Sequence, residues 1–552
     1  MGMFKSASKE KGDAVGRTSP GSGDAKEDVY VSSTPAPGNE ALNEDDAALE
    51  ATTGYKSDFK REFRSLSTIS FAFSIMGLIS SVATTFNTPY TLGGPSSTVF
   101  AWMLGSIMNL TLGAAIGEIV SAYPSSGGLY SASGLLVPAR WRAIVAWITG
   151  WLNFTGQIAG IAGTEYGLAQ MIFAWAFVLT GYTASVGATY GLYVGLLILH
   201  GVLNCFPTGW LARFTSSYVF INLGFTVLTG ILVLARTPSE EMHTGAYVFG
   251  NIVDGTGYGS QAAAFFISLL SVQFVMTDYD ATAHISEEVS RAAIAAPVAI
   301  FVAVAGTGLF GFFLNVAMVF AGGDTASGTI DMWPGGLAFA EIVRLRAGRV
   351  AFLIIWPFIC SVAFFVVQTA LMANARSFYA FSRDGGLPDK KFFARINKKT
   401  TTTVNAVWLV VACCAALGLL SFASYTAVAA IFSLAALGMD LSYLPPIVSA
   451  MIFRNHPDVN FKAGPFFMGY GWWATAVRCI AIVWTLFECV VLSMPQILPF
   501  DASIFNYSWV VLVGILIIAL AFYPFSSYKG PRTGHIQQAG RRPSEASVAV
   551  HH

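Results

Sequence analysis

The stretch Phe265–Arg291, which reads FFISLLSVQFVMTDYDATAHISEEVSR, decides the fold. It begins as an apolar, lipid-compatible helix and then places Thr277, Asp278, Tyr279 and Asp280 in succession, at the depth of the membrane centre. A carboxylate at that depth costs about 2.5–3.5 kcal/mol on insertion scales, so it persists only beside a cavity, a partner or a site. Thr and Asp side chains also compete with the helix for backbone groups. We therefore predict a discontinuous transmembrane helix whose break lines a pathway.

A purely structural explanation of the same stretch stays open. Asp280 and His284 have the i,i+4 spacing that places two side chains on one helix face, where they could form a satisfied pair. Ionisable residues inside a membrane are nevertheless functional by default, and the unperturbed pKa of histidine lies near neutrality. Both residues are therefore candidates for proton coupling or for a gate.

The composition is that of a helical membrane protein. Of the 552 residues, 54% are hydrophobic and only 11% are charged, whereas a soluble domain carries about 25% charged residues. The six cysteines show no metal-ligand spacing and are interpreted as small packing residues. No phosphate-binding loop, zinc motif or nucleophile elbow appears. We therefore expect no enzyme, no metal and no cofactor.

Twelve apolar spans lie between two polar tails, and a span needs roughly 20 helical residues to cross a membrane. Residues 1–62 are predicted to be a disordered tail that could receive phosphate or bind ubiquitin-ligase adaptors, and residues 527–552 a second tail. Residues 63–526 form one predicted domain. The expected spans are 66–91, 97–121, 142–179, 187–206, 213–235, 260–284, 295–321, 349–382, 402–421, 424–451, 471–494 and 505–525.

The distribution of basic residues predicts the orientation. With a cytoplasmic N-terminus, most of the 31 Lys and Arg residues fall in the tails and inner loops. Cytoplasmic loops carry such an excess, so both termini are expected to be cytoplasmic. The basic loop Lys390–Lys399 follows from this rule, and we expect no nucleic-acid partner.

The first span mirrors the sixth. Its sequence SLSTISFAFSIMGLISSVATTFNTPY is interrupted by Gly77 and by the hydroxyls of Ser74, Ser80 and Ser81. Glycine frees the backbone, and Ser and Thr can satisfy the carbonyls that it exposes. Spans one and six hold matching positions in two five-helix sets, 66–235 and 260–451, with two extra helices over 471–525. Paired interruptions of this kind predict an inverted-repeat transporter with its site at the membrane midplane.

The chemistry of the two breaks favours a zwitterion. Backbone amides at a half-helix N-terminus would hold a carboxylate. Asp278 or Asp280 would face an ammonium group or carry a proton. An amino acid has both groups, whereas a purely cationic amine would use the carboxylates alone.

Four features together give a specific resemblance to a known family. They are Gly117-Glu118 with SAYPSSGGLY over 121–130, DYDATAHISEE over 278–288, ANARSFYAFSRDGGLP over 373–388, and the spacing of the spans from about 65 to 525. The chain resembles a fungal member of the amino acid–polyamine–organocation superfamily, in the amino acid/choline transporter branch that includes GABA permeases. The resemblance covers everything except the tails.

The resemblance implies an all-α polytopic fold with a leucine-transporter-like core of two inverted five-helix repeats and two peripheral helices. The substrate would lie between the breaks of spans one and six, walled by spans three and eight. Many relatives have glycine where this chain has Asp278, which implies a charged or hydrated contact here. The implied substrate-binding residues are Ser74, Ile75, Met76, Gly77, Met276, Thr277, Asp278 and Tyr279.

Three further charged residues are candidates for proton coupling or gating. Glu118, near the inner end of span two, is expected either to pair with Arg140 or Arg383 or to carry a proton. Glu165 lies on span three and could be linked to substrate or proton. Arg383 belongs to the RDGGLP helix stop after span eight and could latch an inner gate.

The sequence thus predicts a secondary-active symporter in a plasma membrane, with the vacuolar membrane as the alternative. The expected solute is small and amine-bearing, an amino acid or GABA, driven by the proton gradient. Choline, a polyamine or a vitamin-like cation is the alternative solute. A nutrient receptor with little flux, and then a channel, are the alternative classes of protein.

Overall fold

The computed structural model describes residues 61–207, 209, 217–323, 337–423, 427–459, 461–501, 504–526 and 528–531. These residues all belong to one compact unit within residues 42–552. The two expected tails fall almost entirely outside the described ranges, as do residues 324–336.

The regular secondary structure of the described residues is helical, apart from one isolated backbone bridge between Phe63 and Val289. The first half contains α2 (Ser65–Met76), α3 (Leu78–Thr85), the π-helix η1 (Pro89–Gly93), α4 (Gly94–Ala122), α5 (Gly128–Leu135), α6 (Arg142–Thr180), α7 (Val186–Leu203), α9 (Tyr218–Arg236) and α10 (Gly245–Gly250). The second half contains α11 (Gln261–Ile267), α12 (Leu269–Val275), α13 (Ala281–His284), η2 (Ser286–Glu288), α14 (Ala292–Ala321), α15 (Ala338–Ala347), α16 (Arg349–Arg383), α17 (Val404–Gly418), η4 (Leu419–Phe422), α18 (Ala427–Phe453), α19 (Trp472–Ser493), α20 (Ser508–Phe522) and η5 (Tyr523–Phe525).

Ten helical segments of the described chain are long and apolar enough to cross a membrane. The other two expected spans are α6, which has 39 residues, and the interrupted pair α11 and α12, which is shorter. Apolar side chains such as Ile518, Val350 and Phe220 are exposed on the outer helices, as lipid contact requires. The predicted all-α polytopic membrane fold is confirmed.

The first span breaks at Gly77. This residue separates α2 from α3 and has a φ of 49° and a ψ of 48°, the left-handed conformation that glycine adopts at no steric cost. A Cβ atom here would also lie 2.0 Å from Cγ2 of Val366 on α16. Both the backbone conformation and the close approach of α16 therefore require glycine.

The sixth span breaks where the carboxylates follow one another. α12 ends at Val275 and α13 begins at Ala281, so residues 276–280 lie outside any helix. Asp278 has a φ of 60°, a conformation that non-glycine residues adopt rarely and that Asp tolerates better than most.

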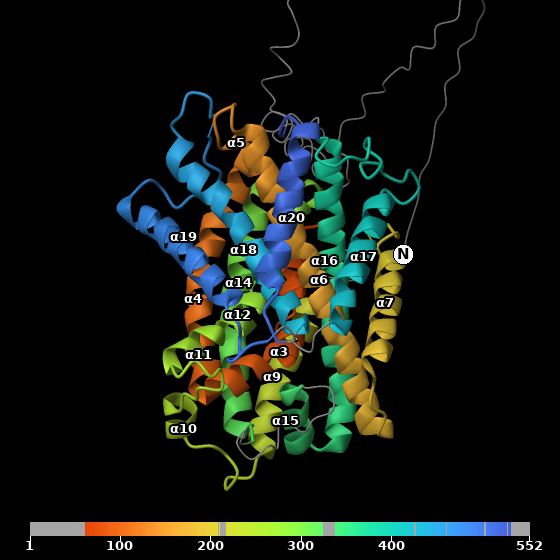
Figure 1. The fold of residues 1–552 in the computed structure, drawn as a ribbon, viewed down its shortest axis with the longest axis vertical. Helices are drawn as coiled ribbons and strands as arrows, with labels where there is room; N and C mark the ends of the chain where they lie inside the picture. The colour runs from red at the N-terminus through yellow and green to blue at the C-terminus, as the bar shows by residue number, and fades with distance from the viewer. Residues whose placement is uncertain are drawn as a thin grey trace, which may run out of the picture. The chain divides into compact units, whose positions relative to one another are not determined.

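Helices from both halves of the chain surround these breaks. α6 packs against α18, α16 and α5, and α14 packs against α4, α2 and α9. Figure 1 shows α6 running beside α16 through the middle of the bundle, with α10 and α15 at one end and α5 at the other. The packing brings both breaks to the interior.

Candidate functional site

A small cavity lies between the two helix breaks. It is enclosed by α2 and α3, the break after α12, α6 and α16, and its volume is about 20 Å³. That volume suffices for about one water molecule, so a larger solute can enter only if these helices move. The lining residues are Ile75, Met76, Ser81, Gly160, Ile161, Thr164, Phe274, Thr277, Asp278, Val366, Val367 and Ala370.

Four of the eight residues expected to bind substrate line this cavity, namely Ile75, Met76, Thr277 and Asp278. The other four contact neighbouring helices. The Thr369 hydroxyl of α16 lies 3.5 Å from the Ser74 hydroxyl, and Met276 is fully buried. The ring of Tyr279 packs on Tyr443, with centroids 5.2 Å apart.

Asp278 presents an unpartnered carboxyl oxygen at the cavity. Its Oδ1 atom is buried and accepts no hydrogen bond from any described residue. Gln157 of α6 acts on this carboxyl from the facing helix, yet neither of its amide atoms makes a hydrogen bond of normal geometry. An unpaired buried charge is costly, so Asp278 is a group that gains from a cationic ligand or a proton.

The first break satisfies most of its own backbone. The hydroxyl of Ser80 donates to the Gly77 carbonyl at 2.9 Å, and that of Ser81 to the Met76 carbonyl at 3.1 Å. The amide of Ile79, in the first turn of α3, donates to Asn222 Oδ1 of α9 at 3.3 Å. A carboxylate at this helix end would therefore compete with Asn222.

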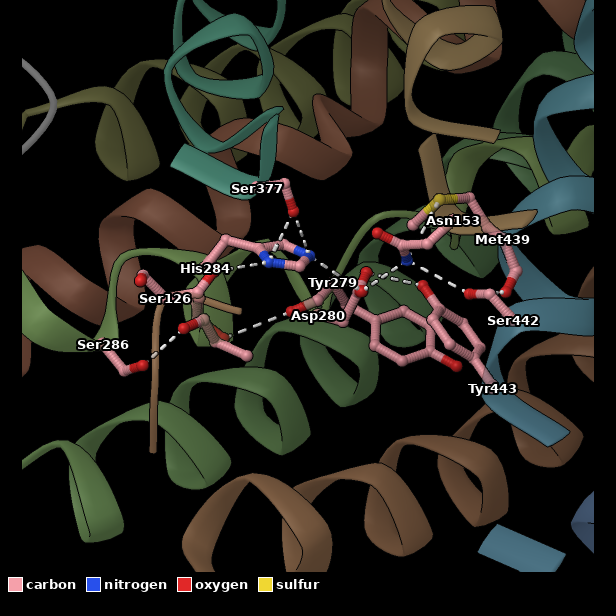
Figure 2. Close-up of polar contacts among 12 residues, drawn as sticks. Ser126, Asn153, Tyr279, Asp280, His284, Ser286, Ser377, Met439, Ser442 and Tyr443 are labelled. Carbon is pink, nitrogen blue, oxygen red and sulfur yellow. Dashed lines mark hydrogen bonds and ion pairs between the residues drawn. The ribbon is translucent and has the colours of Figure 1, made fainter. Parts of the chain in front are cut away.

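Asp280 is fixed away from the cavity lining. Its carboxyl is fully buried; Tyr443 Oη donates to Oδ1 at 2.7 Å, and Asn153 Nδ2 donates to Oδ2 at 3.1 Å. Nε2 of His284 lies 3.4 Å from Oδ2, which is the pairing that the i,i+4 spacing allows. Figure 2 shows these side chains converging on Asp280 from α6, α13 and α18.

His284 extends the polar contacts beyond Asp280. Nδ1 of His284 lies 2.8 Å from the Ser377 hydroxyl of α16 and 3.3 Å from the Ser126 carbonyl. Figure 2 shows the imidazole between Asp280 and Ser377. A continuous series of polar groups thus runs from Tyr443 through Asp280 and His284 to α16.

Comparison with known proteins decides the family. The family model described as amino acid permease matches residues 66–517. The chain belongs to the amino acid permease family. An uncharacterised amino-acid permease of Schizosaccharomyces pombe is 39% identical over 498 residues, which cover 89% of this chain and 90% of the relative. Amino-acid permease 2 of Neurospora crassa is 33% identical, with 93% of each chain covered. A putative polyamine transporter of Candida albicans is 28% identical over 88% of this chain and 89% of its own.

The membership makes this permease an integral, multi-pass membrane protein and a transporter in class. Among the described residues, no group of three or more His, Cys, Asp and Glu side chains is arranged to hold a metal ion.

The partner expected for Glu118 was wrong. Nη2 of Arg478, on α19, lies 2.7 and 2.8 Å from the two Glu118 oxygens, and both side chains are buried. Arg140 is exposed instead, and Arg383 lies 3.6 Å from Glu287. The packing of α19 on α4 places Arg478 there, a contact across 360 residues that no local pattern indicates.

Glu165 of the permease faces a histidine that the sequence analysis did not single out. Its Oε2 lies 3.4 Å from Nε2 of His200 on α7, and both side chains are fully buried. Nδ1 of His200 lies 2.9 Å from Oε1 of Gln368 on α16. Glu165 thus joins α6, α7 and α16, and it is not among the cavity-lining residues.

Two buried carboxyls were missed altogether. Asp440 lies on α18 and Glu488 on α19, and both side chains are buried. Gln273 of α12 donates from Nε2 to Glu488 Oε2 and accepts at Oε1 from Asn109 Nδ2 at 2.7 Å. The sequence alone could have indicated both residues, because each is a carboxyl inside an apolar span.

A larger cavity elsewhere in the permease is a poorer site. It has a volume of about 930 Å³ and lies among α6, α16, α17, α18 and α20. Its lining is mainly apolar, and the carboxyl of Asp389 there already accepts from the Ser382 hydroxyl at 2.6 Å and the Phe393 amide at 2.8 Å. The hydrogen-bonded carboxylate of Asp389 is the one acidic side chain among the described residues of this lining.

Proposed function

We propose that this permease carries an amino acid or a related small amine across the membrane by alternating access, with the cavity between the two breaks as its binding site. The observation that carries the proposal is the unpartnered Asp278 oxygen at the cavity. It would receive the ammonium group of the solute. Ile75, Phe274 and Val366 would surround the aliphatic part.

The size of the cavity supports alternating access. A cavity of about 20 Å³ is too small for an amino acid, so the site must enlarge towards one side and then the other. The breaks at Gly77 and at residues 276–280 let each half-helix move with its own neighbours. Transporters with paired discontinuous helices commonly work by such rocking around a fixed site.

We propose the proton gradient as the driving force. Buried carboxyls and a histidine lie in contact near the break, and Asp280, His284 and Ser377 form a polar path between α13 and α16. Such residues are the usual proton carriers in membrane transporters. Sodium coupling and exchange are the alternatives.

A cationic amine is the second candidate solute, and a specific observation favours it. The Ile79 amide at the start of α3 is engaged by Asn222, which weakens the case for a bound carboxylate. The relative in Candida albicans is named as a putative polyamine transporter. Asp278 would serve a polyamine or choline as well as it serves an amino acid.

Uptake of labelled GABA, neutral amino acids, choline and spermidine in a permease-deficient yeast tests the proposal. Protonophore-sensitive uptake of a zwitterion would support the amino-acid assignment and the proton coupling. Uptake of choline or spermidine without uptake of any amino acid would identify a cationic amine, the second candidate, as the solute. Saturable binding without uptake of any solute would contradict transport and favour a receptor.

The same cells would test the cellular placement that we propose. We place both termini in the cytoplasm and the permease in the plasma membrane, with ubiquitin-ligase adaptors acting on the N-terminal tail. A fluorescent tag on each terminus that resists external protease would agree with this orientation. Signal at the vacuolar rim in growing cells would contradict the choice of membrane.

A further inference from the structure

Asp440 and Glu488 form a carboxyl pair inside the membrane domain. Their side chains have relative exposures of 1% and 0%, and each carboxyl acts directly on the other. The pair bridges α18, the last helix of the second repeat, and α19, which lies outside both repeats. Gln273 of α12 anchors it through Glu488.

No cation among the described residues pairs with either carboxyl. Arg478 is on the same helix as Glu488, but it is bound to Glu118. The charged group of the break that acts on Asp440 is another acid, Asp280. The remaining polar groups that face the pair or its neighbours are neutral at ordinary pH. These groups are Asn109 of α4, Asn153 of α6, Gln273 of α12, Tyr279 at the break, Tyr443 of α18, and Trp484 and Cys489 of α19.

The hydrogen bonding of the pair is incomplete in a way that a proton would complete. Both oxygens of Asp440 and Oε1 of Glu488 accept no hydrogen bond from any described donor. α18 and α19 pack against each other and bury both carboxyls. Two acids that interact in a low-dielectric interior are not both ionised at ordinary pH, and such pairs hold a shared proton. A proton on one carboxyl turns it into an O–H donor, and the other carboxyl can accept that hydrogen bond.

We propose that Asp440 and Glu488 form a proton-binding site of this permease, occupied by one shared proton that is exchanged during transport. The proton is bound from water on one side of the membrane and released to water on the other, and no other bond is made or broken. This assignment rests on the proposed proton-coupled transport.

The contacts of the pair connect its charge to the substrate cavity. Gln273, which donates to Glu488, lies in α12, whose last turn leads into the break at residues 276–280. On the other side, Tyr443 donates to Asp280 and packs on Tyr279. Release of the proton raises the charge of the pair from one negative charge to two. The added charge strengthens the repulsion between α18 and Asp280 at the break. Protonation therefore favours the arrangement in which α12, α18 and α19 are packed together.

Purified permease in proteoliposomes tests the coupling. The variants are Glu488→Gln and Asp440→Asn, which keep the shape and remove the titration, and Glu240→Gln, which changes an exposed outer-loop carboxyl, is the control. For a solute found in the uptake screen, we expect both site variants to keep solute counterflow but to lose accumulation driven by an imposed pH gradient. Glu240→Gln should retain both activities.

Infrared difference spectroscopy supplies a second measurement that needs no transport. A protonated carboxyl has its own C=O stretch, and we expect wild-type permease at neutral pH to show one that Glu488→Gln lacks. If neither variant loses gradient-driven accumulation and the band is unchanged in both, the proposal is wrong. Loss of the band on addition of sodium at constant pH would also overturn it, because the pair would then bind the metal cation.

The two measurements separate the proposals. If wild-type permease moves no amino acid or amine, the proposed function fails, whereas a carboxyl band that depends on Glu488 still supports the shared proton. If wild-type uptake is proton-driven but the band and the coupling survive both substitutions, the proposed function stands and the location of the proton site fails.

Discussion

Asp278 and Asp280 are two residues apart, yet their surroundings give them different roles. Asp278 lines the cavity with an unpartnered oxygen, whereas Asp280 accepts hydrogen bonds from Tyr443 and Asn153. The left-handed backbone at Asp278 separates the directions of the two side chains. The same residue type thus presents an unpartnered oxygen to the cavity at position 278 and accepts two hydrogen bonds at position 280.

Asp278→Asn should abolish uptake while leaving the protein folded. The substitution removes a charge that the fold leaves uncompensated, so the free energy of unfolding should stay equal or rise slightly. Uptake of the labelled solute and surface expression would be measured together. Asp458→Asn, in an exposed loop, is the matched control. Undiminished uptake by Asp278→Asn would remove this carboxyl from the proposed site.

Asp280→Ala should have the opposite effect on the fold and lower its stability. It leaves the buried hydroxyl of Tyr443 without an acceptor, which costs about 1–3 kcal/mol, and it removes one of the two oxygen acceptors of Asn153 Nδ2, which keeps Ser442. Thermal unfolding of the detergent-purified protein should show the loss. A variant as stable as the wild type would mean that these hydrogen bonds contribute nothing net.

Glu118 and Arg478 should show strong coupling. Breaking a buried ion pair by removing one partner costs about 3–5 kcal/mol, because the other charge remains buried. We therefore expect Glu118→Gln and Arg478→Met each to lower stability, and the double variant to recover most of the loss in a double-mutant cycle. Arg140→Met, an exposed arginine, should change little. Additive losses in the double variant would argue against the pair.

At the scale of elements, the helix breaks were predictable and the partners of the buried charges were not. The break at Gly77 was predictable because glycine frees the backbone. The break at Thr277–Asp280 was predictable because two carboxyls interrupt an apolar span. The Arg478 partner of Glu118 and the Glu488 partner of Asp440 come from α19, far away in sequence. Such contacts depend on how helices pack, which the periodicity of one helix does not contain. Half of the cavity lining likewise comes from α6 and α16.

Gly77→Ala should damage the first break. An alanine in the left-handed conformation costs about 1–2 kcal/mol, and its Cβ would clash with Val366. Folded protein and uptake should both fall. Adding Val366→Ala should recover part of the loss by removing the clash, while the backbone strain remains. Full recovery in the double variant would mean that conformation is unimportant at this position.

The loop before α11 should respond to acid. The hydroxyl and amide of Thr256 and the amide of Ser260 donate to Asp254, and the Thr256 hydroxyl above all lowers the pKa of this partly exposed carboxyl. A lowered folded-state pKa contributes stability that is present above the unfolded pKa of about 3.9 and is lost as the pH falls through the folded value. The protection factors of the Thr256 and Ser260 amides against hydrogen exchange should fall in that window. Asp254→Asn should remove the pH dependence.

At the scale of the whole molecule, ion pairs join α16 to the segment after α13. Arg376 Nε lies 2.8 Å from Glu288 Oε1, with both side chains buried, and Arg383 lies 3.6 Å from Glu287. The backbone of Phe63 pairs with the same segment, through Glu288 and Ser290. These contacts connect the start of the first broken helix, the end of the second and the long helix that lines the cavity. We expect opening of the cavity at this end to break them.

Glu288→Gln should therefore shift the permease towards the state that is open at this end. Replacing the carboxylate weakens its ion pair with Arg376, and each 1.4 kcal/mol of difference between states changes their ratio about tenfold. A cysteine at Thr164, which lines the cavity, reports the opening in a background where the native cysteines are serine. Its labelling by an impermeant thiol reagent should accelerate in inside-out vesicles. Glu341→Gln, which breaks the pair with Arg344 in α15, is the control and should leave cytoplasmic labelling unchanged. Equal labelling of Glu288→Gln and wild type, with both proteins folded, would mean that these ion pairs stabilise the fold without holding the gate closed.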